Sequence, residues 1–281
     1  MIYYITIHWK SPLWIEIQNN MIRKHTSGEY KIYGFLNGIN PMYCRFFDVV
    51  RSDSSDPRHD VKLDLLAEMV IAESKNDDDW MVFMDGDTFP VAPLDVTLRQ
   101  YLVQYQLVAI QRLENEGEQH AHPAFCVTTT GFWRSYKPSW RKGYTWKTPQ
   151  GESMTDVGGE LLRVIEQNHI PWKPLQRSNK LNIHPVLFGI YGDLVYHHGM
   201  GFRSEEVIRR DYMMYVQPIR RWDGRVLLRL VPQRWKMRVR KSILHPQGRM
   251  LRQLFRLYNT LNRHVYAELM ADPEQFIASL K

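Results

Sequence analysis

The chain has 281 residues, of which 44% are apolar and 12% are aromatic, and its 16 glycines and 15 prolines follow no period. This composition excludes a chain disordered along its whole length and a collagen-like chain. Two cysteines, Cys44 and Cys126, are too few for a disulfide scaffold or a cysteine-built zinc site, so we expect a reducing compartment and a cytoplasmic location.

The net charge of +7 is unevenly distributed along the chain. Residues 207–264 carry 15 Lys and Arg against Asp211 and Asp223, which leaves a net charge of −6 on the rest. The basic character therefore belongs to the C-terminal part. It indicates either a helix that packs its apolar side on the main domain and keeps its arginine face in water, or an extension that meets an anionic surface, a membrane rather than nucleic acid.

The first third of the chain alternates between strand and helix patterns. Residues 2–9 alternate as a strand does, a helical pattern follows at 14–22, and a second strand is expected at 31–36. This β-α-β opening is the unit of a parallel α/β sheet. No basic leader precedes the first strand and no stretch approaches the roughly 20 apolar residues of a membrane span, so we expect a soluble or peripherally bound protein.

A continuous apolar run at 80–84 predicts a central strand buried on both faces. The remaining expected elements, in chain order, are a helix at 60–74, a helix at 94–102, strands at 107–111 and 124–130, an aromatic loop region at 131–148, a helix at 156–167, a strand-like segment at 187–196 and a basic amphipathic helix at about 247–270.

The motif Asp85-Gly86-Asp87-Thr88 stands at the carboxyl end of the central strand. Ligands of open α/β sheets bind at this end of the strands. Because side chains of an extended chain alternate, Asp85 and Asp87 are expected on one side, and Gly86 between them would allow a tight turn and leave room for a ligand. Two such carboxylates suit Mg²⁺ or Mn²⁺, and the cation would neutralise a diphosphate.

This segment, with its position after a β-α-β opening, resembles the Asp-x-Asp motif of GT-A-fold, nucleotide-sugar-dependent glycosyltransferases. The resemblance covers about 1–203. It implies that Asp85 and Asp87 bind a divalent cation and the ribose and diphosphate of the donor. The fold it implies is a GT-A-like, mixed but mostly parallel sheet flanked by helices.

In that family a late histidine often completes the metal site, and Val195-Tyr196-His197-His198-Gly199 is similar to it, as in glycogenin-like and bacterial lipopolysaccharide galactosyltransferases. The Lys-Pro-Trp that follows in those two groups is replaced here by residues 200–203. Because strand side chains alternate, only one of His197 and His198 is expected to face the metal, and we choose His197.

Further candidates lie around the expected site. The resemblance places the nucleotide base near His8 and Trp9, where Trp9 either stacks on the base or closes the core. Arg58, His59 and Lys62 would meet donor phosphates or ribose, or form a solvated helix face. The aromatic region 131–148 is the expected acceptor side.

Two acids, Asp156 and Glu160, stand at the start of the helix expected at 156–167. They either cap and charge this helix or contact the acceptor hydroxyl, where one of them would be the general base of an inverting enzyme.

The sequence therefore predicts a catalytic domain at 1–205 and a basic, mostly helical extension at 206–281. The expected activity is sugar transfer from a nucleotide-sugar to a hydroxyl of a glycan or lipid-linked glycan. One alternative is a haloacid-dehalogenase-like phosphohydrolase, disfavoured because Phe89 occupies the place of its motif threonine. A second is a non-catalytic module that binds membrane or nucleic acid through the arginine-rich segment.

Overall fold

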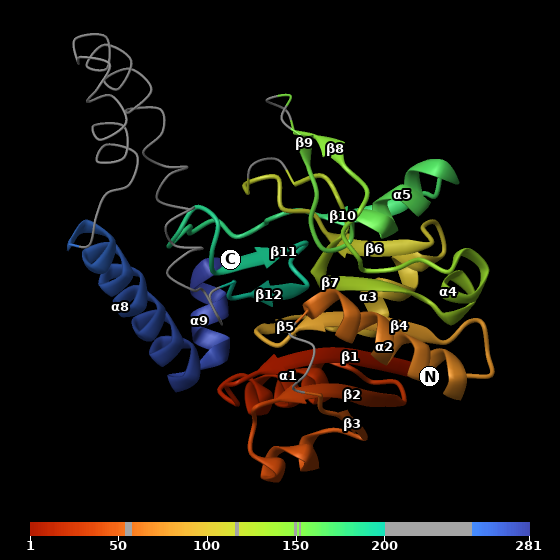
Figure 1. Ribbon diagram of the computed structural model, residues 1–281. Coiled ribbons are helices and arrows are strands. Elements are labelled where there is room, and N and C mark those ends of the chain that lie inside the picture. Colours follow the sequence, from red (N-terminus) through yellow and green to blue (C-terminus); the bar gives the residue numbers. More distant parts are fainter. Residues whose placement is uncertain (54–57, 116–117, 149–150, 152, 200–248) are drawn as a thin grey trace. The chain divides into compact units, whose positions relative to one another are not determined.

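The computed structural model describes residues 1–53, 58–115, 118–148, 151, 153–199 and 249–281 (Figure 1). The chain divides into two compact units, Met1–Gly201 with Glu274–Lys281, and Phe202–Pro273. Most of the basic stretch 207–264 lies outside the described residues. Of the second unit, residues 249–273 are described, and they contain helix α8 (Arg249–Ala271), which matches the helix predicted at 247–270. Its membrane contact stays a prediction.

A seven-stranded sheet forms the centre of the first unit (Figure 1). Every neighbouring pair in it is parallel except the two pairs that involve β7. The α/β class and the mixed, mostly parallel sheet predicted from the sequence are confirmed. In spatial order the strands are β10 (Trp172–Leu175), β6 (Leu107–Ile110), β7 (His122–Thr129), β4 (Trp80–Asp85), β1 (Ile2–Trp9), β2 (Tyr30–Asn37) and β3 (Val49–Arg51).

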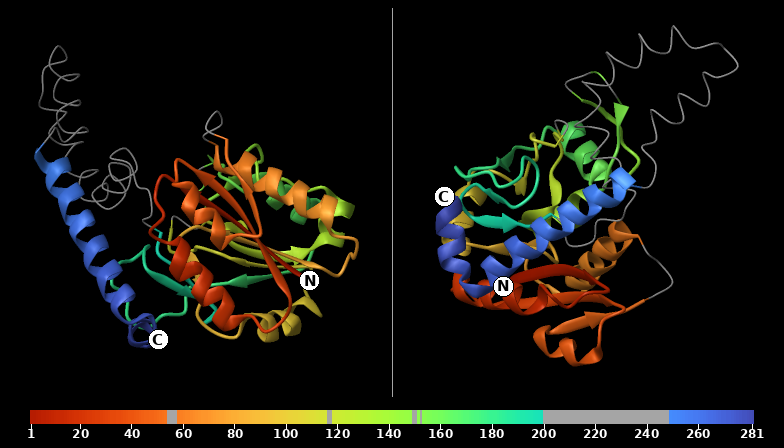
Figure 2. Two further views of the ribbon diagram at one scale, coloured as in Figure 1. Left: turned by 90° about the horizontal axis from the view of Figure 1, so that it is seen from below. Right: turned by 90° about the vertical axis from the view of Figure 1, so that its left-hand side faces the viewer.

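Helices cover both faces of this sheet (Figure 2). The core of one face joins alternate strand residues such as Ile5 and Phe83 to helices α2 (His59–Glu73), α4 (Thr130–Tyr136) and α5 (Gly159–Gln167). The core of the other face joins the intervening residues, such as Tyr4 and Val82, to α1 (Ile15–His25) and α3 (Leu94–Leu102). Since burying one such side chain contributes roughly 1.5–3 kcal/mol, these two cores fix the strand register.

A second, three-stranded sheet extends the carboxyl end of β4. Its strands β11 (Gly189–Tyr191), β12 (Val195–His197) and β5 (Thr88–Pro90) pair antiparallel in that order. The C-terminal helix α9 (Pro273–Leu280) belongs to the same unit, since the ring of Phe276 lies 6.1 Å from that of Tyr196 and the backbone oxygen of Leu280 accepts from Lys180. The last residues of the chain therefore help to support β12.

The region 131–148, expected as an aromatic loop, begins as helix α4. The side chain of Thr129 caps this helix by accepting a hydrogen bond from the backbone N–H of Phe132. The rings of Trp133, Trp140 and Trp146 are buried, while Tyr136 and Tyr144 are half-buried, and the acceptor role of this region stays a prediction. The remaining short elements are η1 (Pro41–Phe46), β8 (Trp146–Lys147) and β9 (Ser153–Met154).

No helix within the described ranges combines the length and the apolar character that crossing a membrane requires.

Candidate metal site

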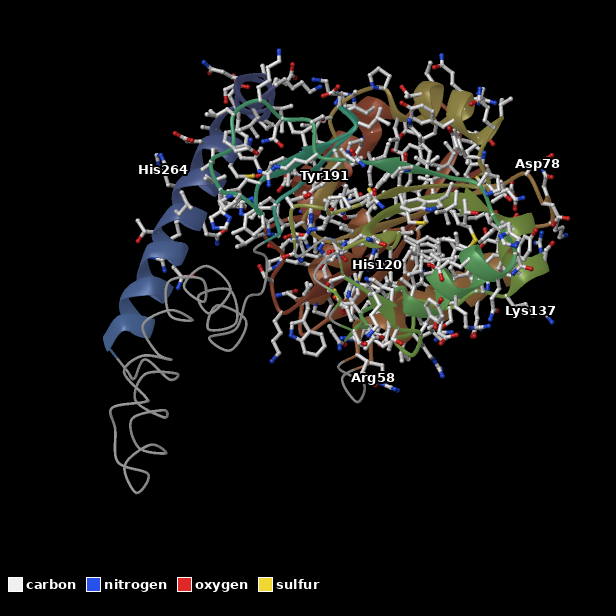
Figure 3. The ribbon with its side chains drawn as sticks, turned by 90° about the horizontal axis from the view of Figure 1, so that it is seen from above. Arg58, Asp78, His120, Lys137, Tyr191 and His264 are labelled. Atoms are coloured by element: carbon white, nitrogen blue, oxygen red, sulfur yellow. The ribbon has the colours of Figure 1, made fainter. Side chains whose placement is uncertain are left out.

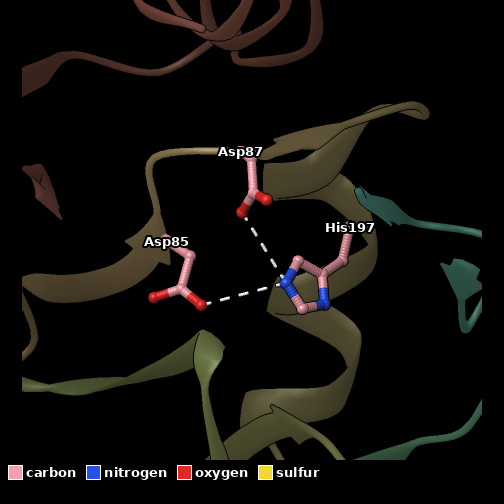
Figure 4. A group of neighbouring side chains, drawn as sticks. All are labelled: Asp85, Asp87 and His197. Carbon is pink, nitrogen blue, oxygen red and sulfur yellow. Dashed lines mark ion pairs between the residues drawn. The ribbon is translucent and has the colours of Figure 1, made fainter. Parts of the chain in front are cut away.

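Two carboxylates and one imidazole meet where the two sheets join (Figure 4). One potential ligand atom from each of Asp85, Asp87 and His197 lies within 4.8 Å of the others. Nε2 of His197 is 3.9 Å from Oδ2 of Asp85 and 3.7 Å from Oδ1 of Asp87. The Asp85 side chain is 23% exposed and that of His197 6%, so the group is anchored in the core and reached by solvent from the Asp85 side.

The backbone brings these side chains together through a tight turn. Gly86 and Asp87 form the tight turn expected at this glycine, between β4 and β5. The turn, rather than the alternation of an extended strand, places both carboxylates on one side. β5 pairs with β12 in the register Thr88 opposite His197. The backbone N–H of Gly199 donates to Oδ2 of Asp87 at 3.1 Å, which leaves Oδ1 facing His197.

The side chain of Gln18 in α1 holds this turn through hydrogen bonds. Its side-chain amide donates to the backbone oxygens of Asp85 at 2.9 Å and Thr88 at 2.7 Å, the residues on either side of the turn. Its Oε1 accepts from Thr6 at 3.1 Å and lies 3.0 Å from Nε2 of His8. The two N–H groups and the two lone pairs of the amide are thereby all used, and the turn is fixed to both α1 and β1.

His8 is buried beneath the turn and is 2% exposed. Burial lowers the pKa of His8 to about 4, although its hydrogen bond to Gln18 raises it. The imidazole is therefore neutral at pH 7 and donates from Nε2. A Cβ at Gly86 would lie 2.6 Å from the Ile7 backbone oxygen and 2.8 Å from Nδ1 of His8, so the close packing of the turn on β1 requires this glycine.

His59 at the start of α2 binds the other oxygen of Asp85. Its Nε2 lies 3.0 Å from Oδ1 of Asp85. Burial raises the pKa of Asp85, but the contact with His59 and the nearby positive groups outweigh this and hold the pKa below its ordinary value. Asp85 is thus ionised at neutral pH and available as a ligand.

The donor set fits a divalent cation of the Mn²⁺ type. Ligands about 2.1 Å from an octahedral cation lie roughly 3 Å apart when adjacent and about 4.2 Å apart when opposite. The distances of 3.7 and 3.9 Å from His197 to the carboxylates fall between these values. Carboxylate oxygens with an imidazole nitrogen suit Mn²⁺ better than Mg²⁺, which prefers oxygen alone.

The other histidine of the pair turns away from this group. Nδ1 of His198 lies 2.9 Å from the hydroxyl of Tyr196, and its ring packs 4.4 Å from that of Trp14 and 4.7 Å from that of Phe188. Side chains of consecutive strand residues point to opposite faces, which separates the two imidazoles.

The residues expected to meet the nucleotide lie at the same edge of the sheet. Nζ of Lys62 lies 3.9 Å from the centre of the Trp9 ring, and Lys62 is only 2% exposed. Lys10 approaches the same ring at 5.3 Å. Trp9 is therefore flanked by two ammonium groups. Arg58, by contrast, is exposed at the outer edge of the unit (Figure 3). Nucleotide contacts of these residues stay predictions.

Asp156 and Glu160 are both engaged in ion pairs outside the metal group. Asp156 Oδ1 lies 3.1 Å from Nζ of Lys142, and Glu160 Oε2 lies 2.7 Å from Nε of Arg163. α5 begins at Gly159, later than expected. Glu160 also lines an open hollow of about 500 Å³, together with Asp64, Glu68, Trp133, Pro138, Ser139, Arg141 and Lys142.

Sequence reasoning missed several residues of this region. The only signal for Gln18 in the sequence is that a polar residue stands between the apolar positions of α1. Arg112 follows β6 at the ligand-binding edge, while Glu118 and His122 sit next to it in space. The rule that ligands meet the carboxyl ends of strands could have found Arg112. It could not have found His122, which opens the one antiparallel strand of the large sheet.

Comparisons with known proteins found similarity in solved structures alone: neither a protein-family model nor a curated protein matches the chain. A crystal structure of S. aureus TarS is similar over 74% of this chain and 38% of its own, with 8% identity and a TM-score of 0.45. The mannosyltransferase PcManGT from Pyrobaculum calidifontis, in complex with GDP-Man and Mn²⁺, is similar over 62% of this chain and 54% of its own, with 10% identity and a TM-score of 0.40. The chain thus spans about two fifths to a half of the length of these proteins.

Proposed function

We propose that this chain is a metal-dependent glycosyltransferase that moves a sugar from a nucleotide-sugar donor to a hydroxyl acceptor. The observation that carries the proposal is the meeting of Asp85, Asp87 and His197 within 4.8 Å at the carboxyl end of a central strand. In an α/β sheet this edge is where ligands bind. A divalent cation held there would supply positive charge to the diphosphate of the donor as it leaves.

The protein's own groups would prepare that site. His59 and the Gly199 N–H each hold one oxygen of an aspartate, so that the remaining oxygens face a common point. Ligands held in this way lose little conformational entropy on binding, which favours affinity. Lys62 and Lys10 beside Trp9 would meet the negatively charged donor from the neighbouring strand end.

The acceptor is proposed to approach from the side of α5. The hollow lined by Trp133, Arg141 and Glu160 has the aromatic, cationic and acidic groups that bind sugar hydroxyls. Glu160, or Asp156 nearby in the chain, would orient or deprotonate the acceptor hydroxyl. A glycan or lipid-linked glycan at an anionic membrane surface is the proposed acceptor, with the basic C-terminal segment as the membrane contact.

A thermal-shift experiment tests the donor site. Wild-type protein is heated with UDP or GDP, with and without Mn²⁺, and compared with Asp87→Asn. Ligand binding to the folded state raises the melting temperature. We expect stabilisation by one diphosphate only when Mn²⁺ is present, and its loss in Asp87→Asn. Asp78→Asn, an exposed aspartate in a turn, is the matched control and should behave as wild type.

Stabilisation of Asp87→Asn equal to that of wild type, or no metal-dependent stabilisation of wild type by any nucleoside diphosphate, would contradict the proposal. Release of nucleoside diphosphate from a panel of sugar nucleotides then tests the transfer itself.

A further inference from the structure

A second polar cluster lies beside the metal group, formed by Arg112, Glu118 and His122. Arg112 and Glu118 are almost fully buried, at 6% and 3% exposed. Arg112 comes two residues after β6 ends, and His122 opens the antiparallel strand β7, so both lie at the edge of the sheet where β4 ends. The ring centre of His122 lies 6.1 Å from that of His197.

The three side chains converge without bonding well to one another. Nε of Arg112 lies 4.0 Å from Oε2 of Glu118, and Nε2 of His122 lies 3.9 Å from the same oxygen. An Nη of Arg112 lies 3.5 Å from Nε2 of His122. Among the described residues, neither Nε of Arg112 nor Oε2 of Glu118 has a hydrogen-bond partner. Buried polar atoms rarely remain unsatisfied, so this arrangement indicates a group that fits between them.

The protonation of His122 follows from its backbone contact. Nδ1 of His122 accepts a hydrogen bond from the N–H of Ala124 at 3.0 Å, so the proton of the neutral ring is on Nε2. The 3.5 Å contact between Arg112 and His122 therefore joins two donors. Together the cluster presents two donors and one carboxylate acceptor toward a common point.

We propose that Arg112, Glu118 and His122 bind a hydroxyl group of the sugar carried by the donor. A hydroxyl has one O–H to donate to Glu118 and two lone pairs to accept from Arg112 and His122, which is the complement of this cluster. This inference rests on the proposed function. The sugar of a nucleotide-sugar is bonded to the diphosphate, so it must lie next to the metal group, where this cluster lies.

The charges of the cluster disfavour other ligands. Burial raises the pKa of Glu118 to about 7, and once it is ionised its carboxylate would repel a phosphate oxygen, while the Arg112 guanidinium would repel a metal ion. A neutral hydroxyl meets both without an unpaired charge, and a water molecule would take the same position until the sugar displaces it.

Calorimetric binding with Mn²⁺ at pH 8, above the pKa of about 7 of Glu118, tests the subsite. The ligands are UDP and GDP, and their sugar conjugates UDP-glucose, UDP-N-acetylglucosamine and GDP-mannose. Glu118→Gln keeps the size of the side chain and removes the charged acceptor. We expect this variant to bind the nucleoside diphosphate as wild type does. It should bind the preferred nucleotide-sugar about 10–100-fold more weakly, because a hydrogen bond to a charged group is lost. Arg112→Lys should show the same selective loss.

Glu114→Gln is the matched control. Glu114 lies in the same loop and accepts from the hydroxyl of Tyr191 at 2.6 Å, so this change removes the same charge but leaves the three converging groups in place. We expect it to bind the nucleotide-sugar as wild type does. Retained diphosphate binding in each variant shows that the variant is folded.

The outcomes separate the two proposals. Absence of Mn²⁺-dependent diphosphate binding in wild type overturns the proposed function. If wild type binds the diphosphate, but Glu118→Gln binds the nucleotide-sugar as tightly as wild type, or melts at the temperature of wild type and loses both ligands to the same degree, the subsite is wrong while the proposed function stands.

Discussion

Nε2 of His59 lies 3.0 Å from Oδ1 of Asp85, the carboxylate oxygen that does not face His197. This ion-pair contact favours the rotation of the carboxylate in which Oδ2 points toward the other two members of the metal group. His59 itself is not among the residues that could hold the ion. His59 contacts the metal ligand Asp85 on the side away from the ion, which is the position of a group that orients the ligand.

His59→Asn should therefore weaken Mn²⁺ binding about 10–100-fold without unfolding the protein, because outer contacts to metal ligands have effects of this size. Titration with Mn²⁺ followed by electron paramagnetic resonance measures the affinity directly. His169→Asn replaces an exposed histidine by a residue that tolerates its left-handed backbone, at φ 51°, and is the control. Equal Mn²⁺ affinity of both variants would rule out the positioning role.

Gln18→Glu tests the support beneath the turn. A carboxylate at this position has no N–H for the backbone oxygens of Asp85 and Thr88, and its charge is repelled by them. Leaving two buried acceptors unsatisfied costs about 2–5 kcal/mol, so we expect the free energy of unfolding to fall by this amount. Urea denaturation measures it, with the exposed neighbour changed by Asn20→Asp as a control that should differ from wild type by less than about 0.5 kcal/mol.

In Gln18→Glu we also expect weaker Mn²⁺ binding at pH values where the protein is still folded, since the turn carries both aspartates. Full stability of the variant would show that the amide contributes little.

How far the sequence predicts this site can be followed in individual residues. The strand ending at Asp85 is predictable because a continuous apolar run between acids can only be buried on both faces. The position of His197 next to Asp87 depends on the pairing of β12 with β5, a contact between residues more than a hundred positions apart that no local pattern encodes. The cluster around Arg112 depends likewise on β7 running antiparallel, which hydrophobic periodicity does not reveal.

The pH dependence of stability should reveal the buried state of Glu118. Burial raises the pKa of Glu118 from 4.5 to about 7, although the nearby Arg112 lowers it. The folded protein then keeps a proton that the unfolded chain loses between these pH values. The contribution of Glu118 to stability is thus fully present below pH 4.5 and is lost as the pH rises to about 7.

Glu118→Gln removes this titration. The free energy of unfolding of wild type minus that of the variant should fall, on the order of 3 kcal/mol, as the pH rises from 4.5 to 7. Urea denaturation of both proteins at several pH values in this range provides the comparison. A difference that stays constant with pH would mean that Glu118 titrates as it does in the unfolded chain.

Gly86→Ala tests whether the turn between the aspartates tolerates a side chain. The added Cβ would meet the backbone oxygen of Ile7 at 2.6 Å, and this oxygen belongs to a central strand that cannot move without disturbing its neighbours. We expect the free energy of unfolding to fall by about 1–3 kcal/mol, which is the usual cost of overpacking. Mn²⁺ binding should also weaken, because Asp85 and Asp87 would be displaced relative to each other. Gly28→Ala is the control, since its Cβ would have no neighbour closer than 3.7 Å. If both variants bind Mn²⁺ and unfold as wild type does, the turn accommodates a side chain despite the short distances to Ile7 and His8. The close packing of the motif on β1 would then not be what holds the two carboxylates together.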